Sequence, residues 1–455
     1  MRVTLPLLLL LTACTGRHSP DSGDSAVDSQ GDSVADDSTP DSDTQESGDS
    51  HGDSQDSGPD CTLADPLGQI GITLQSGDDA AVYYTDGDTP LMADGYQVVL
   101  SIKGTTGSGG VPVETPYATA GFGYLQVYVN VPKDRRGAGS RAAVAATARF
   151  AAGLEPDAQG CYLADLVSVP VSATPPLVLG HSNGGVLAIA TLADATLDMP
   201  AISGIVTFET PISAQFVDVE LGAVNHQNPL YLPGSCAWDP LSGLECAYSS
   251  TPVLGWDPTY QDGGRGPIGA VFFDADGNGT KSVDEYPVFG VGTVVDEPTV
   301  AFSPQMTRLI EAQGLEGPTR LDLADADAWW ADRDGSRLAV AALENHPGVP
   351  LIAIGTLEDH VAGVSDHAHI TAEAQIWRDS GSPWVRVNPA PVYMQETAGV
   401  GPSWTDNPPN LATFLGNPEV HMEPDEFDTG FAPDQYCAAA LIELATRTAN
   451  GDWSE

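Results

Sequence analysis

The chain has 455 residues and carries 63 acidic against 17 basic side chains, a formal net charge of −46 at pH 7. A charge this negative repels phosphate backbones and anionic lipid head groups, which argues against nucleic-acid binding. Residues 61–455 alone keep 50 acids against 15 bases, and they are numerous enough to bury one large core.

The chain begins with a short hydrophobic stretch that is typical of an export signal. Met1-Arg2-Val3 gives a positive start, and the run from Leu5 to Leu11 falls far short of the roughly 18 apolar residues that a transmembrane helix needs. The run ends in Leu11-Thr12-Ala13-Cys14, which resembles the bacterial lipobox. The resemblance implies that residues 1–13 are removed as a signal peptide and that Cys14 is acylated.

The segment of residues 14–60 follows, and after the cysteine it consists mostly of Asp, Ser, Gly, Thr, Gln and Pro. Such a composition cannot bury a core, and its like charges extend the chain. We therefore expect a disordered tether that holds residues 61–455 away from a membrane. The expected location is the bacterial cell envelope, at the outer membrane or the cell surface, with the N-terminal lipid as the only membrane contact.

Strands and helices alternate along residues 61–455. Strands are predicted over residues 71–74, 80–84, 96–103, 124–131, 176–180, 202–208, 349–354 and 384–387, and helices over 140–152, 183–197 and 434–447. Because several of these strands are almost wholly apolar, they are expected to be buried on both sides. The sequence therefore predicts the α/β class, with a mostly parallel sheet that helices cover on both faces.

A glycine-rich turn joins the strand at 176–180 to the helix at 183–197. Gly180-His181-Ser182-Asn183-Gly184 fits the pattern Gly-x-Ser-x-Gly, preceded by apolar residues and followed by a helix-forming run. A strand-to-helix turn this tight strains the serine backbone, and larger residues two positions before and after it would clash. The turn lifts the hydroxyl of Ser182 above the sheet, where the N-terminus of the helix favours negative charge.

This arrangement resembles the nucleophile elbow of the α/β-hydrolase superfamily, in a form similar to that of its lipases and esterases. The resemblance extends in order over residues 95–210 and 345–450. It implies the α/β-hydrolase fold, Ser182 as nucleophile, and the backbone N–H of Asn183 as one oxyanion donor. The second donor is expected in the loop that begins at Gly104, with Thr105 as the candidate.

Residues 210–346 do not continue the alternation and are predicted to be a large insertion, placed where a lid or cap would lie. Helices are expected within it near 303–314 and 326–344. Cys236 and Cys246 flank a short loop that suits one disulfide. One further pair is plausible among Cys61, Cys161 and Cys437, but the sequence does not select it.

The insertion also contains a pattern that fits the twelve-residue EF-hand loop. Oxygen-bearing side chains fall at positions 1, 3, 5, 7, 9 and 12, which are Asp274, Asp276, Asn278, Thr280, Ser282 and Glu285, with Gly279 at position 6. Lys281 stands where an apolar residue usually anchors the loop, and Phe272-Phe273 enter as a strand rather than a helix. We expect a structural Ca²⁺ site of low affinity and no organic cofactor.

The acid of a catalytic triad is expected at the end of the strand that follows the insertion. Gly355-Thr-Leu-Glu358-Asp359-His360-Val361 is similar to the Gly-x-x-x-Asp-His-Val turn of several hydrolase branches, which favours Asp359. Glu358 lies on the same turn. Glu209, which follows the strand at 202–208, is a rarer alternative.

The base must be a histidine, because imidazole takes up and returns a proton near neutral pH. His421 lies after the last strand and before the final helix, which is the place that the chain order Ser…Asp…His requires. His367 and His369 are the alternatives, although a helix directly after the acid is a poor place from which to reach Ser182.

These residues together predict a tethered serine hydrolase that cleaves a carboxylic ester of a small molecule or lipid through an acyl-enzyme intermediate. Two alternatives stay open. One is a peptidase or amidase of the same fold, and the other is a hydrolase-like scaffold that only binds.

Overall fold

The computed structural model describes residues 61, 69–84, 89–104, 122–132, 134–223, 226–260, 269–293, 299–355, 361, 366–390, 392–393 and 433–454. Residues Cys61–Glu455 form one compact unit. The predicted signal peptide, the predicted lipidation site Cys14 and the predicted tether lie outside the described residues. None of the described helices is both long and apolar enough to cross a membrane.

The central sheet follows the order β1-β2-β5-β4-β6-β7-β17-β18, and β3 pairs with β5 beside this path. The bounds are β1 Gln69–Thr73, β2 Asp79–Tyr84, β3 Thr89–Pro90, β4 Gln97–Ile102, β5 Phe122–Val129, β6 Leu177–His181, β7 Gly204–Phe208, β17 Leu351–Ile354 and β18 Val385–Val387. β2 is antiparallel to β1 and β5, and each neighbouring pair from β5 to β18 is parallel. The strand order changes direction between β4 and β6, and ligands bind at the carboxyl ends of strands next to such a point.

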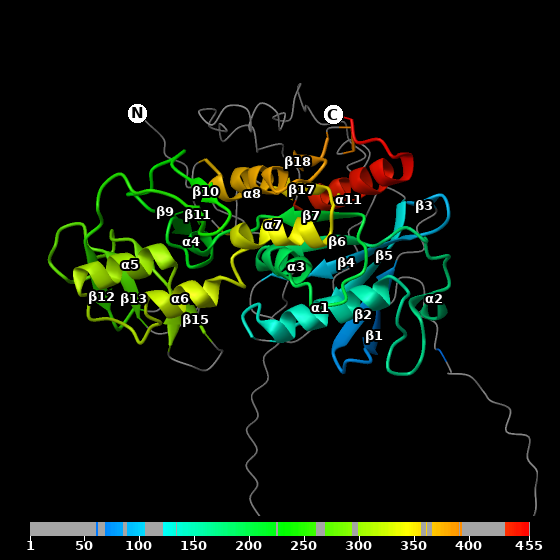
Figure 1. Ribbon diagram of the computed structural model, residues 1–455, viewed down its shortest axis with the longest axis horizontal. Coiled ribbons are helices and arrows are strands. Elements are labelled where there is room, and N and C mark those ends of the chain that lie inside the picture. The colour runs from blue at the N-terminus through cyan, green and yellow to red at the C-terminus, as the bar shows by residue number, and fades with distance from the viewer. Residues whose placement is uncertain are drawn as a thin grey trace, which may run out of the picture. The chain divides into compact units, whose positions relative to one another are not determined.

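Helices cover both faces of this sheet (Figure 1). Consecutive strand residues face opposite sides, so that Ile205 on β7 belongs to the same hydrophobic cluster as residues of α1 (Ala138–Ala151), α3 (Asn183–Ala193) and α8 (Ala368–Asp379). Its neighbour Val206 packs with α11 (Pro433–Asn450). Burial on both faces explains the almost continuous apolar sequence of the inner strands. The predicted α/β-hydrolase fold is confirmed.

Two predicted helices end differently in the structure. α3 stops at Ala193 instead of 197, because the Asp194 side chain accepts a hydrogen bond from the N–H of Thr196 and forms a turn there. The single helix expected over 326–344 is two helices, α6 (Leu323–Trp330) and α7 (Gly335–Asn345). The Asp334 side chain caps α7 by accepting the N–H of Ser336, which starts a new helix in a new direction.

The segment between β7 and α7 contains short elements. They are α4 Ala214–Val217, β8 Gly222–Ala223, β9 His226–Gln227, β10 Ala237–Asp239, β11 Gly243–Glu245, β12 Leu254–Asp257, β13 Ala270–Phe273, β14 Pro287–Val288, β15 Val291–Gly292, β16 Val300–Ala301, α5 Pro304–Gln313 and α6. Some of these elements join the main core, as Phe216 on α4 and Leu244 on β11 do. A small separate core lies between β12, β13 and α5, and it includes Val271, Phe302 and Ile310. α7 instead packs along α3 and belongs to the main core. The remaining short helix, α2 (Leu163–Leu166), lies between α1 and β6 in the chain.

Two disulfides are present among the described residues. The predicted bridge between Cys236 and Cys246 is confirmed. Cys61 pairs with Cys161, which settles the pairing that the sequence left open, and Cys437 is buried on α11. The first described residue of the domain is therefore covalently tied to the segment just before α2.

Candidate active site

Ser182 occupies a strained turn between β6 and α3. Its backbone has φ 53° and ψ −126°, a left-handed conformation that residues with a Cβ rarely adopt. The turn is held by a hydrogen bond of 2.8 Å from the N–H of Ser182 to the carbonyl of Phe208 on β7. The side chain is 4% exposed at the carboxyl end of the sheet. Strain of this kind persists where the surrounding structure enforces it, and it is concentrated at functional sites.

Two glycines make this turn possible. A Cβ atom on Gly180 would lie 2.5 Å from the Cα of Gly185, and one on Gly184 would lie 2.2 Å from the carbonyl oxygen of Ile102. Both obstacles are backbone atoms, which cannot move aside as a flexible side chain can. The glycines two positions before and after Ser182 are therefore sterically required by the approach of α3 to β6 and β4.

The end of β4 lies directly beside the serine. A Cβ atom on Gly104 would be 2.8 Å from the Cβ of Ser182 and 2.9 Å from the carbonyl oxygen of His181. The loop predicted to supply the second oxyanion donor therefore starts next to the nucleophile, although Thr105 itself lies outside the described residues. Asn183, the other predicted donor, is the first residue of α3, where backbone N–H groups lack partners within the helix.

Backbone strain recurs along this edge of the sheet. Glu209 directly follows β7 with φ 46°, and Asn388 directly follows β18 with φ 56°. They are 1% and 2% exposed. Together with Ser182 after β6, three of the four adjacent strands β6, β7, β17 and β18 end in a left-handed residue that is not glycine. The carboxyl edge of the sheet thus holds three of the seven non-glycine residues with positive φ in the described fold.

The turn predicted to carry the acid begins within this strained edge. Asp359 lies outside the described residues, but Gly355, at the start of its turn, donates its N–H to the Oδ1 of Asn388 at 3.1 Å. The N–H of Asn388 donates to Ala353 on β17 at 2.9 Å. Glu209, the alternative acid, donates its N–H to Ile354 at 2.8 Å. Sequence patterns gave no signal for Asn388, because its role depends on β17 and β18 lying side by side.

The predicted base, His421, also lies outside the described residues, in the segment between β18 and α11. Of the two alternatives, His369 on α8 is fully buried, with its ring centroid 5.4 Å from that of Phe216. His367 precedes α8 with φ 44°, and its ring lies 6.3 Å from that of His369. His181 of the elbow stacks on Phe208 at 5.1 Å.

The predicted metal loop closes a hairpin between β13 and β14. Ligand atoms of Asp274, Asp276 and Glu285 all lie within 4.8 Å of one another. Asp274 accepts the N–H groups of Asn278 and Gly279, and Glu285 accepts those of Ala275 and Ser282. Gly279 adopts φ 72°, as the sharp turn at position 6 requires. Three converging carboxylates form an oxygen donor set that suits a hard cation such as Ca²⁺.

The loop departs from the EF-hand in its surroundings. Strands β13 and β14 flank it instead of helices, with Val271 opposite Val288. Lys281, at the position of the usual apolar anchor, extends over the ring of Tyr260 with its Nζ 4.6 Å from the centroid. A cation–π contact therefore takes the place of the hydrophobic anchor.

Comparisons with known proteins give structural likeness without sequence similarity. No protein-family model matches the chain, and no curated protein matches it. Carboxyl esterase 2 of the fungus Tuber melanosporum is 11% identical in sequence. The match covers 87% of this chain and 91% of that esterase, with a TM-score of 0.36. Brefeldin A esterase, described as a bacterial homologue of human hormone-sensitive lipase, is 13% identical in sequence. The match covers 84% of this chain and 77% of that esterase, with a TM-score of 0.34. The acylaminoacyl peptidase of Pyrococcus horikoshii is 11% identical in sequence. The match covers 70% of this chain and 35% of that peptidase, with a TM-score of 0.33. Likeness at this level carries no information on activity, so the site must be argued from its own geometry.

Proposed function

We propose that the protein is a serine hydrolase that cleaves carboxylic esters. The observation that carries this proposal is the left-handed Ser182 at the junction of β6 and α3, with the start of the β4 loop beside it. Such a turn costs free energy, and it serves to present one hydroxyl at a helix N-terminus. A structural serine in the same place would not need this conformation.

In the proposed mechanism, His421 removes the proton of the Ser182 hydroxyl while Asp359 orients the imidazole. The serine oxygen attacks the acyl carbon, and the resulting oxyanion is stabilised by the N–H groups of Asn183 and Thr105. His421 then protonates the leaving alcohol, and water releases the acyl group by the reverse sequence of proton transfers.

The proposal extends to location and metal. A lipid on Cys14 and the acidic tether would place the domain outside the cytoplasm at the bacterial envelope.

Ca²⁺ held by Asp274, Asp276 and Glu285, with Asn278, Thr280 and Ser282 completing the loop, would stabilise the small core beside β12, β13 and α5. A subdomain with so few buried apolar residues gains stability from a bound metal.

Labelling with a fluorophosphonate probe tests the nucleophile. The wild-type chain should be labelled, and Ser182→Ala should not. Ser203→Ala is the matched control, because Ser203 precedes β7 at the opposite end of the strands and its hydroxyl bonds only the Pro175 carbonyl. Absence of labelling in folded wild-type protein would leave the scaffold that only binds as the better interpretation.

The base and the bond type need separate measurements. His421→Ala should lower kcat by roughly 10³-fold or more, whereas a comparable loss confined to His367→Ala or His369→Ala would move the base to α8. Chromogenic esters of increasing acyl length, compared with matched anilides, separate esterase from amidase. Faster cleavage of the anilides would favour the peptidase alternative.

A further inference from the structure

A strained turn with two buried acidic side chains connects α4 to the rest of the insertion. Val219 adopts φ 54°, which is unusual for a residue branched at Cβ. Its neighbours Asp218 and Glu220 are both buried. Burial raises the pKa of both side chains, and repulsion from Glu220 raises the pKa of Asp218 further. This turn persists only because surrounding groups hold it in place.

Hydrogen bonds from three directions satisfy the two carboxylates. The N–H of Ser303 donates to Asp218 at 2.7 Å, and the hydroxyls of Ser303 and Tyr248 both donate to Glu220. Gln215 on α4 donates to Glu220 at 3.2 Å. The strained turn is therefore tied to the start of α5 and to the segment after the Cys236–Cys246 disulfide.

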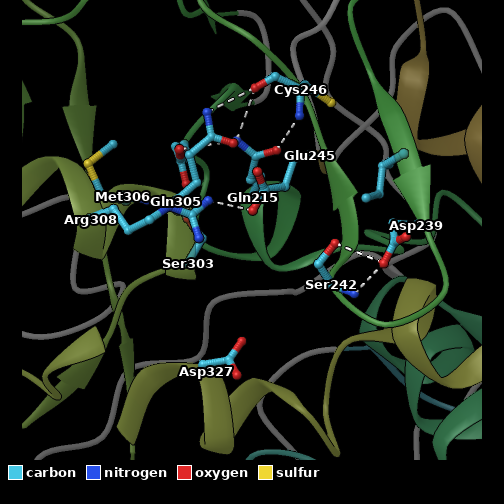
Figure 2. A network of polar contacts seen from close by, with 12 residues as sticks. Gln215, Asp239, Ser242, Glu245, Cys246, Ser303, Gln305, Met306, Arg308 and Asp327 are labelled. Carbon is cyan, nitrogen blue, oxygen red and sulfur yellow. Dashed lines mark hydrogen bonds and ion pairs between the residues drawn. The ribbon is translucent and has the colours of Figure 1, made fainter. Parts of the chain in front are cut away.

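Figure 2 shows how α4 itself is attached to the insertion. The side chain of Gln215 donates to Gln305 on α5 at 2.7 Å and accepts the N–H of Cys246 at 2.7 Å. Gln305 in turn donates to the Cys246 carbonyl at 3.0 Å. These contacts join α4, α5 and the disulfide into one polar cluster.

One end of the metal loop contacts this turn directly, and the other end reaches it through Tyr248. Tyr286 directly follows the ligand Glu285, and its hydroxyl donates to the carbonyl of Val219 at 2.7 Å. Phe273 directly precedes the ligand Asp274, and its ring packs edge-on against Tyr248, the donor to Glu220, at 5.5 Å. The N–H of Phe273 also donates to the carbonyl of Tyr286 at 2.9 Å, so the two ends of the loop are joined.

The turn is connected to the candidate active site through α4. α4 begins at Ala214, five residues after Glu209, and the N–H of Ala214 donates to Asp334 at 2.9 Å. Phe208, which precedes Glu209, accepts the N–H of Ser182. A displacement of α4 would therefore act on the strand end that holds the serine turn.

We propose that the metal loop and the Asp218–Glu220 turn form a single cooperative unit, in which Tyr286 transmits cation binding at Asp274 and Glu285 to α4. The inference rests on the proposed Ca²⁺ site. An ion that fixes both ends of the loop also fixes Tyr286 and Phe273, which hold the strained turn. Because coupling is reciprocal, weakening the contact at Val219 must weaken Ca²⁺ binding although no ligand is changed.

Calorimetric titration of the full chain with Ca²⁺ tests the coupling without an activity assay. Tyr286→Phe removes only the hydroxyl that reaches Val219 and should weaken Ca²⁺ binding about fivefold, the equivalent of one ordinary hydrogen bond. Tyr83→Phe is the matched control, since Tyr83 is buried on β2, next to the edge strand β1. The Ca²⁺ affinity of this variant should equal that of the wild type. If Tyr286→Phe does not fold, Tyr248→Phe tests the second contact in the same way, with an effect in the same direction.

Hydrogen exchange locates the effect along the chain. Addition of Ca²⁺ should slow exchange at the amides of residues 215–220 at least tenfold in the wild type, in parallel with those of the loop, and much less in Tyr286→Phe. Protection of the loop alone, or equal Ca²⁺ affinity in wild type and Tyr286→Phe, would overturn the coupling. Absence of Ca²⁺ binding to the wild type would overturn both the coupling and the metal site, while Ser182 labelling tests the hydrolase independently.

Discussion

Gly104 and Ser182 lie so close together that a side chain on the first would collide with the second. The 2.8 Å separation between a Cβ atom on Gly104 and the Cβ of Ser182 is shorter than real Cβ contacts allow. The loop after β4 can therefore approach the serine only with its backbone. A backbone N–H is also the group that an oxyanion requires at this place.

We expect Gly104→Ala to lower kcat by about tenfold or more with little loss of fold, because the methyl group must displace either the serine side chain or the loop. Ester hydrolysis and thermal unfolding of the same preparation provide the measurement. Gly71→Ala on β1 is the control, because nothing lies within 4 Å of its Cβ position. Equal turnover in wild type and Gly104→Ala would argue against an oxyanion donor in this loop.

Local patterns in the sequence were sufficient for most helices, the serine turn and the strands of the central sheet apart from the two-residue β3, but not for most of the short strands of the insertion. Gly180 approaches Gly185, which is close to it in the chain, whereas Gly184 approaches Ile102 on β4. Their spacing is still visible in the sequence, because both glycines flank Ser182 in the Gly-x-Ser-x-Gly pattern.

The break between α6 and α7 was missed, although the cap that Asp334 forms on the N–H of Ser336 is a local signal. The same side chain also accepts the N–H of Ala214, 120 residues earlier, and the sequence does not show that contact. Asn388 was missed because its contacts with β17 and Gly355 are likewise not visible in the sequence.

The Cys61–Cys161 disulfide should contribute substantially to stability, because it closes a loop of 100 residues. In the chain-entropy treatment a cross-link of this span is worth about 4–5 kcal/mol, against roughly 3 kcal/mol for the ten-residue span of Cys236–Cys246. Denaturant unfolding of Cys61→Ser/Cys161→Ser and Cys236→Ser/Cys246→Ser double variants checks this order. A smaller loss for the first pair would show that the tie between Cys61 and the segment before α2 is already held by other contacts.

Glu373 on α8 makes stability depend on pH. Burial raises its pKa to about 8, and the nearby Thr207 hydroxyl offsets only part of that rise. Neither carboxylate oxygen has a hydrogen bond of ordinary geometry within the described part of the chain. The pKa of Glu373 is higher in the folded than in the unfolded state. The contribution of this side chain to the free energy of unfolding is therefore fully present below about pH 4.5 and is lost as pH rises to about 8.

Glu373→Gln has no carboxyl group to deprotonate and should escape this loss. Relative to the wild type, the variant should gain stability between about pH 5 and 8, by at most about 5 kcal/mol. Chemical unfolding at several pH values gives the measurement, with Glu443→Gln as the comparison, because Glu443 is buried but paired with Arg447. If the free energy of unfolding changes with pH in the same way in wild type and Glu373→Gln, water reaches this carboxylate in the folded protein.

Ca²⁺ should raise the unfolding temperature by a few degrees. With the dissociation constant of about 10⁻⁴–10⁻³ M that extracellular loops of this type show, 10 mM Ca²⁺ contributes about 1.4–2.7 kcal/mol. Glu285→Gln should abolish the shift. Asp284→Asn is the matched control, since position 11 supplies no ligand, and it should keep the shift. An equal change of unfolding temperature on addition of chelator in Glu285→Gln and wild type would show that this loop does not bind Ca²⁺.

Asn388 offers the sharpest test of how the acid turn is positioned. Asn388→Gly keeps the left-handed backbone without strain but removes the Oδ1 that accepts the N–H of Gly355. The turn that carries Asp359 then loses its fixed starting point, so kcat should fall about tenfold with little change in unfolding temperature. Weaker support of the imidazole should also move the acidic limb of the kcat/KM profile to lower pH. Asn388→Ala adds backbone strain and should lose stability as well, which separates the two roles. Unchanged kcat and pH profile in Asn388→Gly would place the acid elsewhere, with Glu209 as the next residue to test.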